Sequence, residues 1–311
     1  MLRRMIRIFR LAWIIWKNNI RLVHLNLHFE ASLVVAACAI TCVPLIVHVR
    51  NMVTEPVDSS LRKSDGIIVI SKAVSDALFS VGKLTPADVA GRLWLVPDGR
   101  ELSPYRDGDR LQVRRELGWD QGEKIVGMVA RITPMKGQEI FLQMAAFVAK
   151  ALPEARFLLV GGPFDDHGAE YLRNLQQLVS NLGLSDRVVF TGYREDVPRL
   201  LSALDCFVHP SRRGAFVSVL IEAMASRIPI VASDVDGIPE CVGRDGAAAL
   251  VYPITPEGFA EATLKILQDK QIAANMGRIG RLRAQRYEIT GLARETENIF
   301  DTVRNRFRTF L

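Results

Sequence analysis

The sequence has few of the residues that bind metals or redox cofactors. Its four cysteines, Cys38, Cys42, Cys206 and Cys241, form no CxxC pair and lie in no cysteine and histidine cluster with zinc-binding spacing. No G-x-G-x-x-G run follows a first strand with a ribose-binding acid downstream, which argues against an oxidoreductase on a dinucleotide-binding fold. These absences argue against a zinc site and indicate reduced thiols in a cytoplasmic setting.

Acidic residues are missing from positions 1–22, where every charged side chain is basic. The six cations are Arg3, Arg4, Arg7, Arg10, Lys17 and Arg21. They equal the whole net charge of +6, so the rest of the chain is neutral overall. Because the positive charge is confined to one terminal segment, the sequence predicts no nucleic-acid partner.

Placed on a helix, this segment has cations on one side and apolar residues, including Trp13 and Trp16, on the other. The pattern is typical of an interfacial helix on an anionic membrane surface, at the inner face of the membrane. The alternative is a helix packed on its own sheet with a solvated basic face. A signal peptide fits less well, because the apolar stretch 11–16 is short and no small-residue cleavage site follows promptly.

Residues 31–49 contain no charged side chain and are long enough to resemble a membrane span. Pro44 and His48 weaken that interpretation, and alternating short apolar runs continue after them. We therefore expect a buried helix at about 30–41 and a buried strand at 44–49. With 49% apolar and 24% charged residues over 311 positions, the chain has the composition of a soluble globular enzyme.

Short β-branched runs alternate with helical patterns along the chain, which predicts an α/β fold. Four runs precede a polar linker near 100–110, and six follow it. They start near residues 22, 44, 66 and 92, and then near 125, 155, 187, 206, 229 and 248. We expect two Rossmann-like doubly wound parallel sheets, the first incomplete. The domains are predicted at 1–104 on the acceptor side and 105–290 for the nucleotide, with a helix at 291–311 packing back on the first domain.

Ligands bind at the carboxyl ends of strands in such sheets, and three loops there carry suitable groups. The first loop, 131–137, holds Arg131 and Lys136 beside a helix start, an arrangement suited to a diphosphate. The other two are 211–218, before the helix that carries Glu222, and 236–240. Each loop alone has a plainer explanation, such as a solvated charge or a turn. Together they predict a nucleotide diphosphate ligand.

The run VGMVARITPMKGQEIFL, followed by FLLVGG, RVVFTGYREDVPRLLSALDCFVHPS, LIEAMASRIPIVASDVDGIPE and DGAAALVYP, resembles family-four glycosyltransferases of the GT-B fold in order and spacing. The resemblance implies a second domain that binds a nucleotide-diphosphate sugar and a first domain that binds the acceptor. It also implies hexosyl transfer with retention of configuration, without a cofactor or a bound metal.

The same resemblance assigns roles to particular residues. It implies Arg131 and Lys136 as catalytic contacts to the donor diphosphate, Glu222 on the ribose hydroxyls, and backbone near the base around Tyr193 and Arg194. The remaining donor-binding positions are Gly162, Phe216, Val217 and Ser218. In the first domain, His48 stands at the position of a catalytic-cleft histidine that contacts the transferred sugar; a satisfied core histidine is the alternative.

Three positions depart from the family pattern. Gly214 stands where a glutamate normally contacts the donor sugar, and Val217 and Asp236 stand where glycine is usual. A β-branched side chain at 217 is expected to crowd the ligand. The first domain is also expected to lack about three strands and a glycine-rich loop of the usual complete sheet, which a partner chain could supply.

Two functions follow as hypotheses. The first is an active glycosyltransferase that acts on a cell-envelope or lipid-linked glycan in polysaccharide biosynthesis, peripherally held at the membrane by its basic first helix. The second is a non-catalytic nucleotide-sugar-binding subunit, or a degenerate remnant of such an enzyme, which the departures at 214 and 217 favour.

Overall fold

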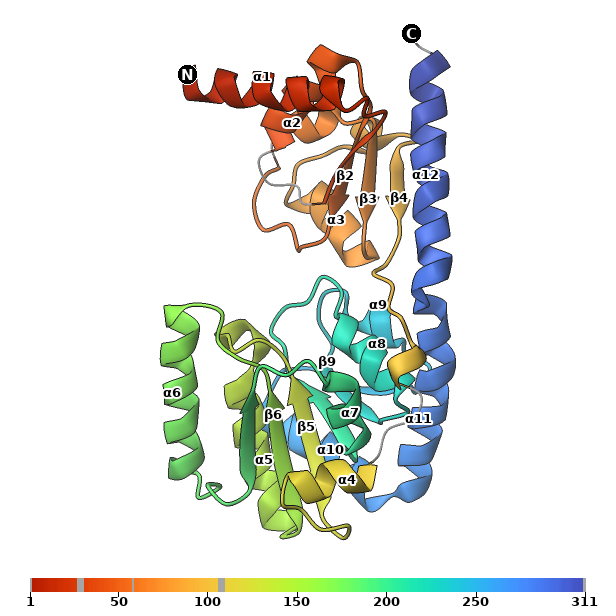
Figure 1. Cartoon of the computed structure of the whole chain (residues 1–311). Helices are drawn as coiled ribbons and strands as arrows, with labels where there is room; N and C mark the ends of the chain where they lie inside the picture. Colours follow the sequence, from red (N-terminus) through yellow and green to blue (C-terminus); the bar gives the residue numbers. More distant parts are fainter. Residues whose placement is uncertain (1, 27–30, 58, 106–109, 310–311) are drawn as a thin grey trace. The chain divides into compact units, whose positions relative to one another are not determined.

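The computed structural model describes residues 2–26, 31–57, 59–105 and 110–309. Two compact units make up the chain. Unit 1 comprises Met1–Gly99 and Ile289–Leu311, and unit 2 comprises Arg100–Glu288 (Figure 1). None of the helices in the described ranges is long and apolar enough to cross a membrane.

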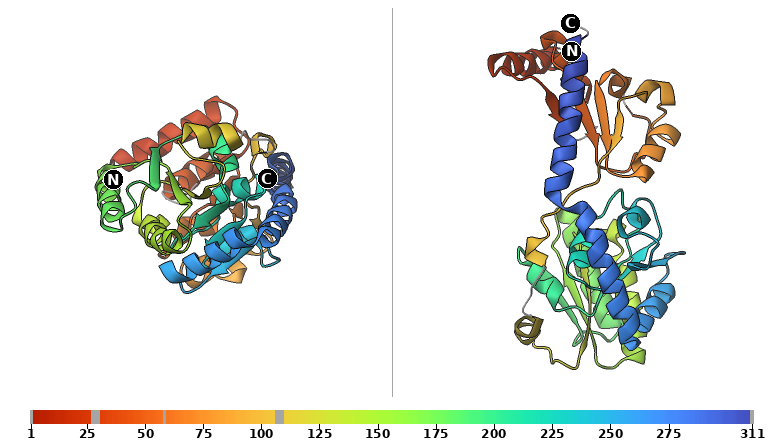
Figure 2. Two further views of the ribbon diagram at one scale, coloured as in Figure 1. Left: turned by 90° about the horizontal axis from the view of Figure 1, so that it is seen from below. Right: turned by 90° about the vertical axis from the view of Figure 1, so that its right-hand side faces the viewer.

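Unit 1 contains four parallel strands in the order β1-β2-β3-β4, so each strand pairs with the next one along the chain. Its elements are α1 (Leu2–Lys17), β1 (Val23–Leu25), α2 (Ala31–Thr41), β2 (Leu45–Val49), η1 (Ser59–Lys63), β3 (Gly66–Val69), α3 (Lys72–Ser80), η2 (Pro86–Val89), β4 (Leu93–Leu95) and α12 (Ile289–Thr309). All four predicted strands are present. The C-terminal helix α12 lies along this sheet in both views (Figures 1 and 2), and its Ile299 and Val303 join Ile46 and Ile68 in one hydrophobic cluster.

The helix expected before β2 is present, but it is only partly buried. Helix α2 forms over the predicted residues, but among its described side chains only Ala37 and Cys38 are buried, and Ile40 is 53% exposed. One face of α2 packs against α1, where Ala12 and Ile15 are buried and Arg4 donates to Ser32 Oγ at 3.0 Å. The uncharged composition of α2 therefore reflects contact with another helix as well as with the sheet.

Unit 2 contains six parallel strands in the order β10-β9-β8-β5-β6-β7. Its elements are η3 (Ser103–Tyr105), α4 (Arg110–Glu116), β5 (Lys124–Val129), η4 (Pro134–Lys136), α5 (Gln138–Ala151), β6 (Ala155–Val160), α6 (Asp166–Asn181), β7 (Val188–Gly192), α7 (Val197–Ser202), β8 (Cys206–His209), α8 (Ser218–Ala225), β9 (Ile230–Ser233), α9 (Ile238–Val242), β10 (Ala248–Val251), α10 (Pro256–Gln268), α11 (Lys270–Ala284) and η5 (Gln285–Tyr287). The direction of the strand order reverses between β5 and β8, which makes this pair the switch point of a doubly wound sheet. The predicted α/β class with two parallel sheets is confirmed, although the strand order reverses only in unit 2 among the described strands.

Helices cover both faces of the unit 2 sheet, because successive strand residues point to opposite sides. Ile125 and Phe207 face a cluster that includes residues of α8 and α9, whereas the adjacent Val126 and Cys206 face one that includes residues of α5 and α10. All four side chains are fully buried. The uninterrupted apolar runs of these strands are thus explained by burial on two faces.

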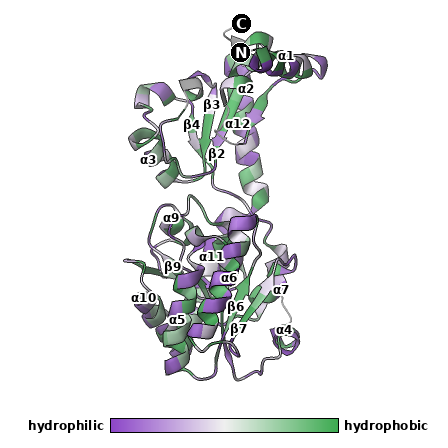
Figure 3. Ribbon diagram, turned by 90° about the vertical axis from the view of Figure 1, so that its left-hand side faces the viewer, coloured by the Kyte–Doolittle hydropathy of each residue, from purple (hydrophilic) through white to green (hydrophobic). Residues whose placement is uncertain are grey.

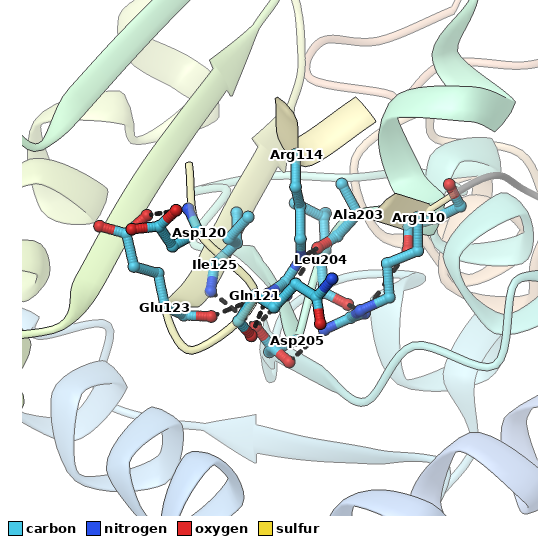
Figure 4. Close-up of polar contacts among 10 residues, drawn as sticks. Arg110, Arg114, Asp120, Gln121, Glu123, Ile125, Ala203, Leu204 and Asp205 are labelled. Carbon is cyan, nitrogen blue, oxygen red and sulfur yellow. Dashed lines mark hydrogen bonds and ion pairs between the residues drawn. The ribbon is translucent and has the colours of Figure 1, made fainter. Parts of the chain in front are cut away.

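The amino ends of β5 and β8 are joined by a saturated polar network (Figure 4). Asp205 pairs with Arg110 and with Arg114, whose Nη2 lies 2.6 Å from its Oδ2, and it accepts from Ile125 N at 2.7 Å. The Arg114 guanidinium, only 3% exposed, also donates to the carbonyl oxygens of Ala203, Gln121 and Glu123. A buried cation is tolerated here because its donors are satisfied.

Candidate functional site

A pocket of about 680 Å³ lies at the carboxyl edge of the unit 2 sheet, beside the switch point between β5 and β8. Parallel sheets place ligands at this edge. All nine residues that the sequence predicts for donor binding line this one pocket. They are Arg131, Lys136, Gly162, Tyr193, Arg194, Phe216, Val217, Ser218 and Glu222.

The loops after β5 and β8 are fastened to each other. Arg212 N and Ser211 Oγ donate to the Met135 carbonyl oxygen at 2.9 and 3.1 Å. Gly137 has φ of 74°, and a Cβ atom there would lie 2.2 Å from the Pro210 carbonyl oxygen. Only glycine permits this close approach, so Gly137 allows the Arg131–Lys136 loop to lie against the loop that leads to α8.

Gly161, which the sequence analysis did not single out, is the glycine whose conformation the next loop requires. Gly161 has φ of 137°, and a Cβ atom there would lie 1.9 Å from the Ala130 carbonyl oxygen. At Gly162 an added Cβ atom would meet nothing closer than Tyr193 N at 3.4 Å. Gly161 therefore fixes the backbone approach between the ends of β5 and β6, and Gly162 leaves space beside Tyr193.

Arg131 and Lys136 give the pocket positive charge without a counterion. In the described part of the chain neither side chain forms an ion pair or donates a hydrogen bond, and the Arg131 side chain is exposed. Burial lowers the pKa of Lys136, and the charge of Arg131 lowers it further. Two cations held close together without an acid attract an anion, and a diphosphate satisfies both.

His209, at the end of β8, is a pocket residue that sequence analysis missed. Its side chain is 1% exposed, and neither ring nitrogen has a hydrogen-bond partner among the described residues. Burial and the charge of Lys136 lower its pKa to about 3, so the ring is neutral at pH 7. Buried polar atoms without hydrogen-bond partners are rare in proteins, and a ligand in this pocket would supply a partner for the His209 ring. The only sequence signal was its position as the last residue of a buried strand.

Glu222, on α8, is the one carboxylate that lines the pocket. Its Oε1 accepts from Arg100 Nε at 3.0 Å, and it also accepts a hydrogen bond from the Tyr105 hydroxyl. Burial raises the pKa of Glu222, while Arg100 and Tyr105 act in the opposite direction. The sequence places Arg100 and Tyr105 in a polar linker. In the structure both residues belong to unit 2, where Arg100 lines the pocket and Tyr105 contacts Glu222, while residues 106–109 lie outside the described ranges.

The pocket lining also includes aromatic rings and an arginine that forms an ion pair with a neighbouring aspartate. Tyr193 is 77% exposed, and Arg194 forms a two-pronged pair with Asp196 at 2.7 Å on each prong. Phe216 packs edge-on against Tyr287 with ring centroids 5.4 Å apart. The exposed Tyr193 ring offers a stacking surface for a planar group.

The three departures from the family pattern lie together. Gly214 N donates to Asp236 Oδ2 at 3.0 Å, and a Cβ atom on Gly214 would lie 2.8 Å from Val217 Cγ2. Val217 is only 6% exposed and packs into the core. The Val217 side chain therefore occupies the space that the Cβ atom of a larger residue at position 214 would need. The Asp236 carboxylate accepts a hydrogen bond from the backbone N–H of Gly214.

His48 belongs to unit 1, on β2. Its ring stacks on His24 with centroids 5.5 Å apart, and its Nε2 is buried without a partner among the described residues. Burial and the neighbouring His24 lower its pKa to about 4. A hollow of about 490 Å³ lies at the same edge of the sheet, where Arg50 Nη2 and Asp98 Oδ1 pair at 2.6 Å. Across the described ranges, no three His, Cys, Asp or Glu side chains are grouped to hold a metal ion.

The sequence matches known proteins over the region that builds this pocket. The model of the family described as "Glycosyl transferases group 1" matches residues 109–283. The D-inositol 3-phosphate glycosyltransferase of Nocardia farcinica is 34% identical over 230 residues, covering 72% of this chain and 51% of the relative. The protein of the same name from Mycobacteroides abscessus is 33% identical over 210 residues, covering 67% and 45%. The chain spans about half the length of these relatives.

Solved structures share the fold over nearly the whole chain. HepE from Anabaena, in a complex with UDP, matches with a TM-score of 0.85 and 23% identity, covering 95% of this chain and 82% of that one. Sucrose-phosphate synthase from Thermosynechococcus elongatus matches with a TM-score of 0.81 and 25% identity, covering 95% and 77%. The likeness to HepE is one of fold alone.

Proposed function

The chain belongs to the glycosyl transferases group 1 family, and from this premise we propose that it transfers a sugar from a nucleoside diphosphate sugar to an acceptor. The observation that carries this proposal is the pocket at the switch point of unit 2. There Arg131 and Lys136, which have no counterion in the described part of the chain, lie in the same pocket as the single carboxylate of Glu222. Cations suit the two phosphates, and a carboxylate accepts from the ribose hydroxyls.

The chemistry requires little beyond these groups. Breaking the bond between the sugar and the diphosphate leaves negative charge on the departing phosphate oxygen, and fixed cations stabilise that charge as it develops. We assign this role to Arg131 and Lys136. We propose hexosyl transfer with retention of configuration, as the family resemblance implies.

A panel of nucleoside diphosphates and their sugar conjugates tests the donor proposal. At least one of UDP, GDP and ADP should raise the unfolding temperature of the purified chain, because a ligand that binds only the folded state stabilises it by mass action. Incubation of the stabilising sugar nucleotide with acceptor candidates then tests transfer. If no nucleoside diphosphate binds, the proposed function is wrong.

The acceptor is proposed to bind at the carboxyl edge of the unit 1 sheet. His48, the Arg50–Asp98 ion pair and the hollow beside them lie at this edge. A cell-envelope or lipid-linked glycan is the acceptor class that we favour, because α1 offers a surface suited to a membrane. Inositol phosphate is the comparison acceptor, since the curated relatives are named for its glycosylation.

Helix α1 carries a large apolar stripe exposed to solvent. Its members are Leu2, Met5, Ile6, Phe9, Trp13 and Trp16, which are 45–75% exposed. They recur three or four residues apart, as one face of a helix requires, and are distinct from the buried Ala12 and Ile15 that face α2. Figure 3 shows hydrophobic and hydrophilic residues side by side along this helix. Cations beside exposed tryptophans match the headgroup region of an anionic bilayer, so we propose peripheral membrane binding through α1.

Flotation with lipid vesicles tests this surface. The chain should bind vesicles that contain phosphatidylglycerol more strongly than vesicles of phosphatidylcholine alone, and salt should weaken the binding. Trp16→Ser should reduce it, whereas Tyr252→Ser is the matched control, since both rings are 75% exposed and Tyr252 lies in unit 2. Equal binding by the Trp16 variant would contradict the proposal. Retention after high-salt and alkaline washing would instead indicate a membrane span.

A second candidate function is a non-catalytic nucleotide-sugar-binding subunit, or a degenerate remnant, with a partner chain completing the first domain. The packing of Val217 into the space beside Gly214 favours it, because no side chain projects from position 214 towards a donor sugar. Tight nucleotide binding without transfer to any acceptor, and without hydrolysis of the donor, would support this alternative over an active enzyme.

A further inference from the structure

The segment that enters unit 2 forms one wall of its pocket. Arg100 N donates to the Tyr287 carbonyl oxygen at 2.8 Å, and Arg100 pairs with Glu288 in a short parallel bridge. This pairing fixes the backbone of Arg100, from which the side chain lines the pocket beside Glu222. A second side chain from the same segment, Tyr105, reaches the same carboxylate.

The Arg100 guanidinium uses only part of its donor capacity. Its Nε donates to Glu222 Oε1 at 3.0 Å, and among the described residues its two Nη groups donate to nothing. The side chain is 41% exposed, whereas that of Glu222 is 13% exposed. Arg100 therefore places unused donors at the open side of a carboxylate that is otherwise buried.

We propose that Arg100 is a positioning and recognition residue that holds the Glu222 carboxylate in place and, together with it, recognises the vicinal hydroxyls of a ribonucleotide. This inference rests on the proposed function, because it takes the ligand of the pocket to be a nucleoside diphosphate. The proposal gives the segment Arg100–Tyr105 a role in selecting the donor nucleotide, although this segment lies outside the sequence motifs described above.

The chemistry of the pair explains the choice of ligand. A hydroxyl group both donates and accepts, whereas a carboxylate can only accept and a guanidinium can only donate. The Arg100–Glu222 pair therefore satisfies both capacities of a ribose hydroxyl at once. A 2′-deoxyribose would leave part of this pair without a partner, and sites built to hydrogen-bond a hydroxyl discriminate strongly against ligands that lack it.

Arg100 also maintains the charge on Glu222. Arg100 and Tyr105 are the two groups that face this carboxylate and oppose the rise in its pKa that burial causes. The ionised form is the one that accepts from hydroxyls, so binding is lost as the pH falls through the pKa of Glu222. Removing the guanidinium should raise that pKa further and move the loss of binding to higher pH.

Calorimetry with paired nucleotides tests the proposal on the full chain. Whichever of UDP, GDP and ADP binds wild type most tightly is compared with its 2′-deoxy form from pH 5.5 to 8.5. Wild type should prefer the ribonucleotide by about tenfold or more, as expected for one charge-assisted contact. Arg100→Met should lower ribonucleotide affinity by about tenfold, affect the deoxy form less, and shift the acid loss of binding to higher pH. Arg100→Lys should restore part of the pH profile, because it retains a positive charge.

Arg156→Met is the matched control. Arg156 pairs with Glu123 through Nε and Oε1 at 2.6 Å, the same pair of atoms as in Arg100–Glu222, but at the amino ends of the strands. It should bind like wild type. If Arg100→Met does not fold, Tyr105→Phe should still move the acid loss of binding to higher pH.

An unchanged ribose preference and an unchanged pH profile in the Arg100 variants, with wild-type binding intact, would overturn this inference alone. An unchanged profile in Tyr105→Phe, where Arg100→Met fails to fold, would overturn it too. Absence of nucleotide binding by wild type would instead overturn the proposed function on which it rests.

Discussion

The carboxyl edges of the two sheets share a histidine but differ in how their charges are compensated. His48 on β2 of unit 1 and His209 on β8 of unit 2 both have lowered pKa values and ring nitrogens without partners in the described ranges. In unit 1 the neighbouring cation, Arg50, is paired with Asp98 at 2.6 Å. In unit 2 Arg131 and Lys136 lack such a partner among the described residues.

This difference indicates what each edge is suited to bind. An edge whose cation is already neutralised can receive a neutral, hydroxyl-bearing group without attracting competing anions. An edge with two uncompensated cations attracts an anionic ligand, which neutralises their charge. The amino end of the unit 2 sheet provides the contrast within one unit, because the buried Arg114 there has its donors satisfied by Asp205 and carbonyl oxygens. The two ends of the unit 2 sheet therefore differ in how their arginine and lysine charges are compensated.

The largest expected effect comes from removing that charge. Lys136→Ala should weaken nucleoside diphosphate binding by about 1.5–3 kcal/mol, because one charge-assisted contact to the phosphates is lost. Isothermal titration calorimetry measures the change. Lys150→Ala is the control, since Lys150 lies in the last turn of α5, at the opposite end of the helix that follows Lys136. Unchanged affinity in the Lys136 variant would remove the basis for calling this edge an anion site.

The two histidines provide a second test, through pH. The folded pKa of His209, about 3, lies below the ordinary value of 6.5, so the unfolded chain takes up a proton first as the pH falls. The resulting stability is complete above pH 6.5 and is lost below it. At pH 5 the loss from His209 amounts to about 2 kcal/mol relative to pH 7.

Urea unfolding of His209→Gln at pH 7 and pH 5 measures this loss, which the variant should no longer show. His48→Gln should remove a loss of similar size at pH 5, because the folded pKa of His48, about 4, also lies below 5. The exposed His167 provides a control, and its Gln variant should follow wild type at both pH values. Equal pH dependence in wild type and His209→Gln would show that His209 is not held neutral by burial.

Much of this architecture was predictable because it depends on local patterns. All ten predicted runs became strands, and strands such as β3 and β8 are buried on both faces. The loop residues Arg131 and Lys136 were recognisable because cations beside a helix start have few structural uses. The pattern could not predict that α2 is only half-buried, since an uncharged helix has the same composition whether it faces a sheet or another helix.

The residues missed in the pocket share a different cause. Arg100 and Tyr105 lie in a polar stretch without periodicity. The contact of Arg100 with Glu222 joins positions 122 residues apart in the chain. His209 ends a run that is otherwise explained by burial alone. Gly161 adopts a φ of 137°, which favours glycine. From the sequence alone, either of the adjacent glycines 161 and 162 could have this conformation. Such contacts depend on tertiary packing, which local patterns do not encode.

A third test concerns the crowded position in the unit 2 pocket. Gly214→Glu alone should lower the free energy of unfolding by about 1.5 kcal/mol, because its Cβ would lie 2.8 Å from Val217 Cγ2 and 3.1 Å from Ile238 Cγ1. Adding Val217→Gly should relieve part of this cost, and the double variant should prefer a sugar nucleotide over the free diphosphate. Thermal unfolding and calorimetry measure the two effects. Strong sugar discrimination by wild type would show that another group, such as Asp236, already contacts the sugar.

The smallest expected effect lies in unit 1, where the Asp98 carboxylate that neutralises Arg50 can be removed. Asp98 raises the pKa of His48, whereas Arg50 and His24 lower it. Asp98→Asn should therefore lower the pKa of His48 below its value of about 4, by less than about one unit, because the pair is partly exposed and screened by solvent. Titration of the His48 ring signals by NMR measures the shift. The double variant Arg50→Met/Asp98→Asn removes both opposing charges and should return the pKa towards that of wild type. If the pKa of His48 shifts in Asp98→Asn and the same shift persists in the double variant, the shift comes from altered burial. The two edges would then not differ by charge compensation.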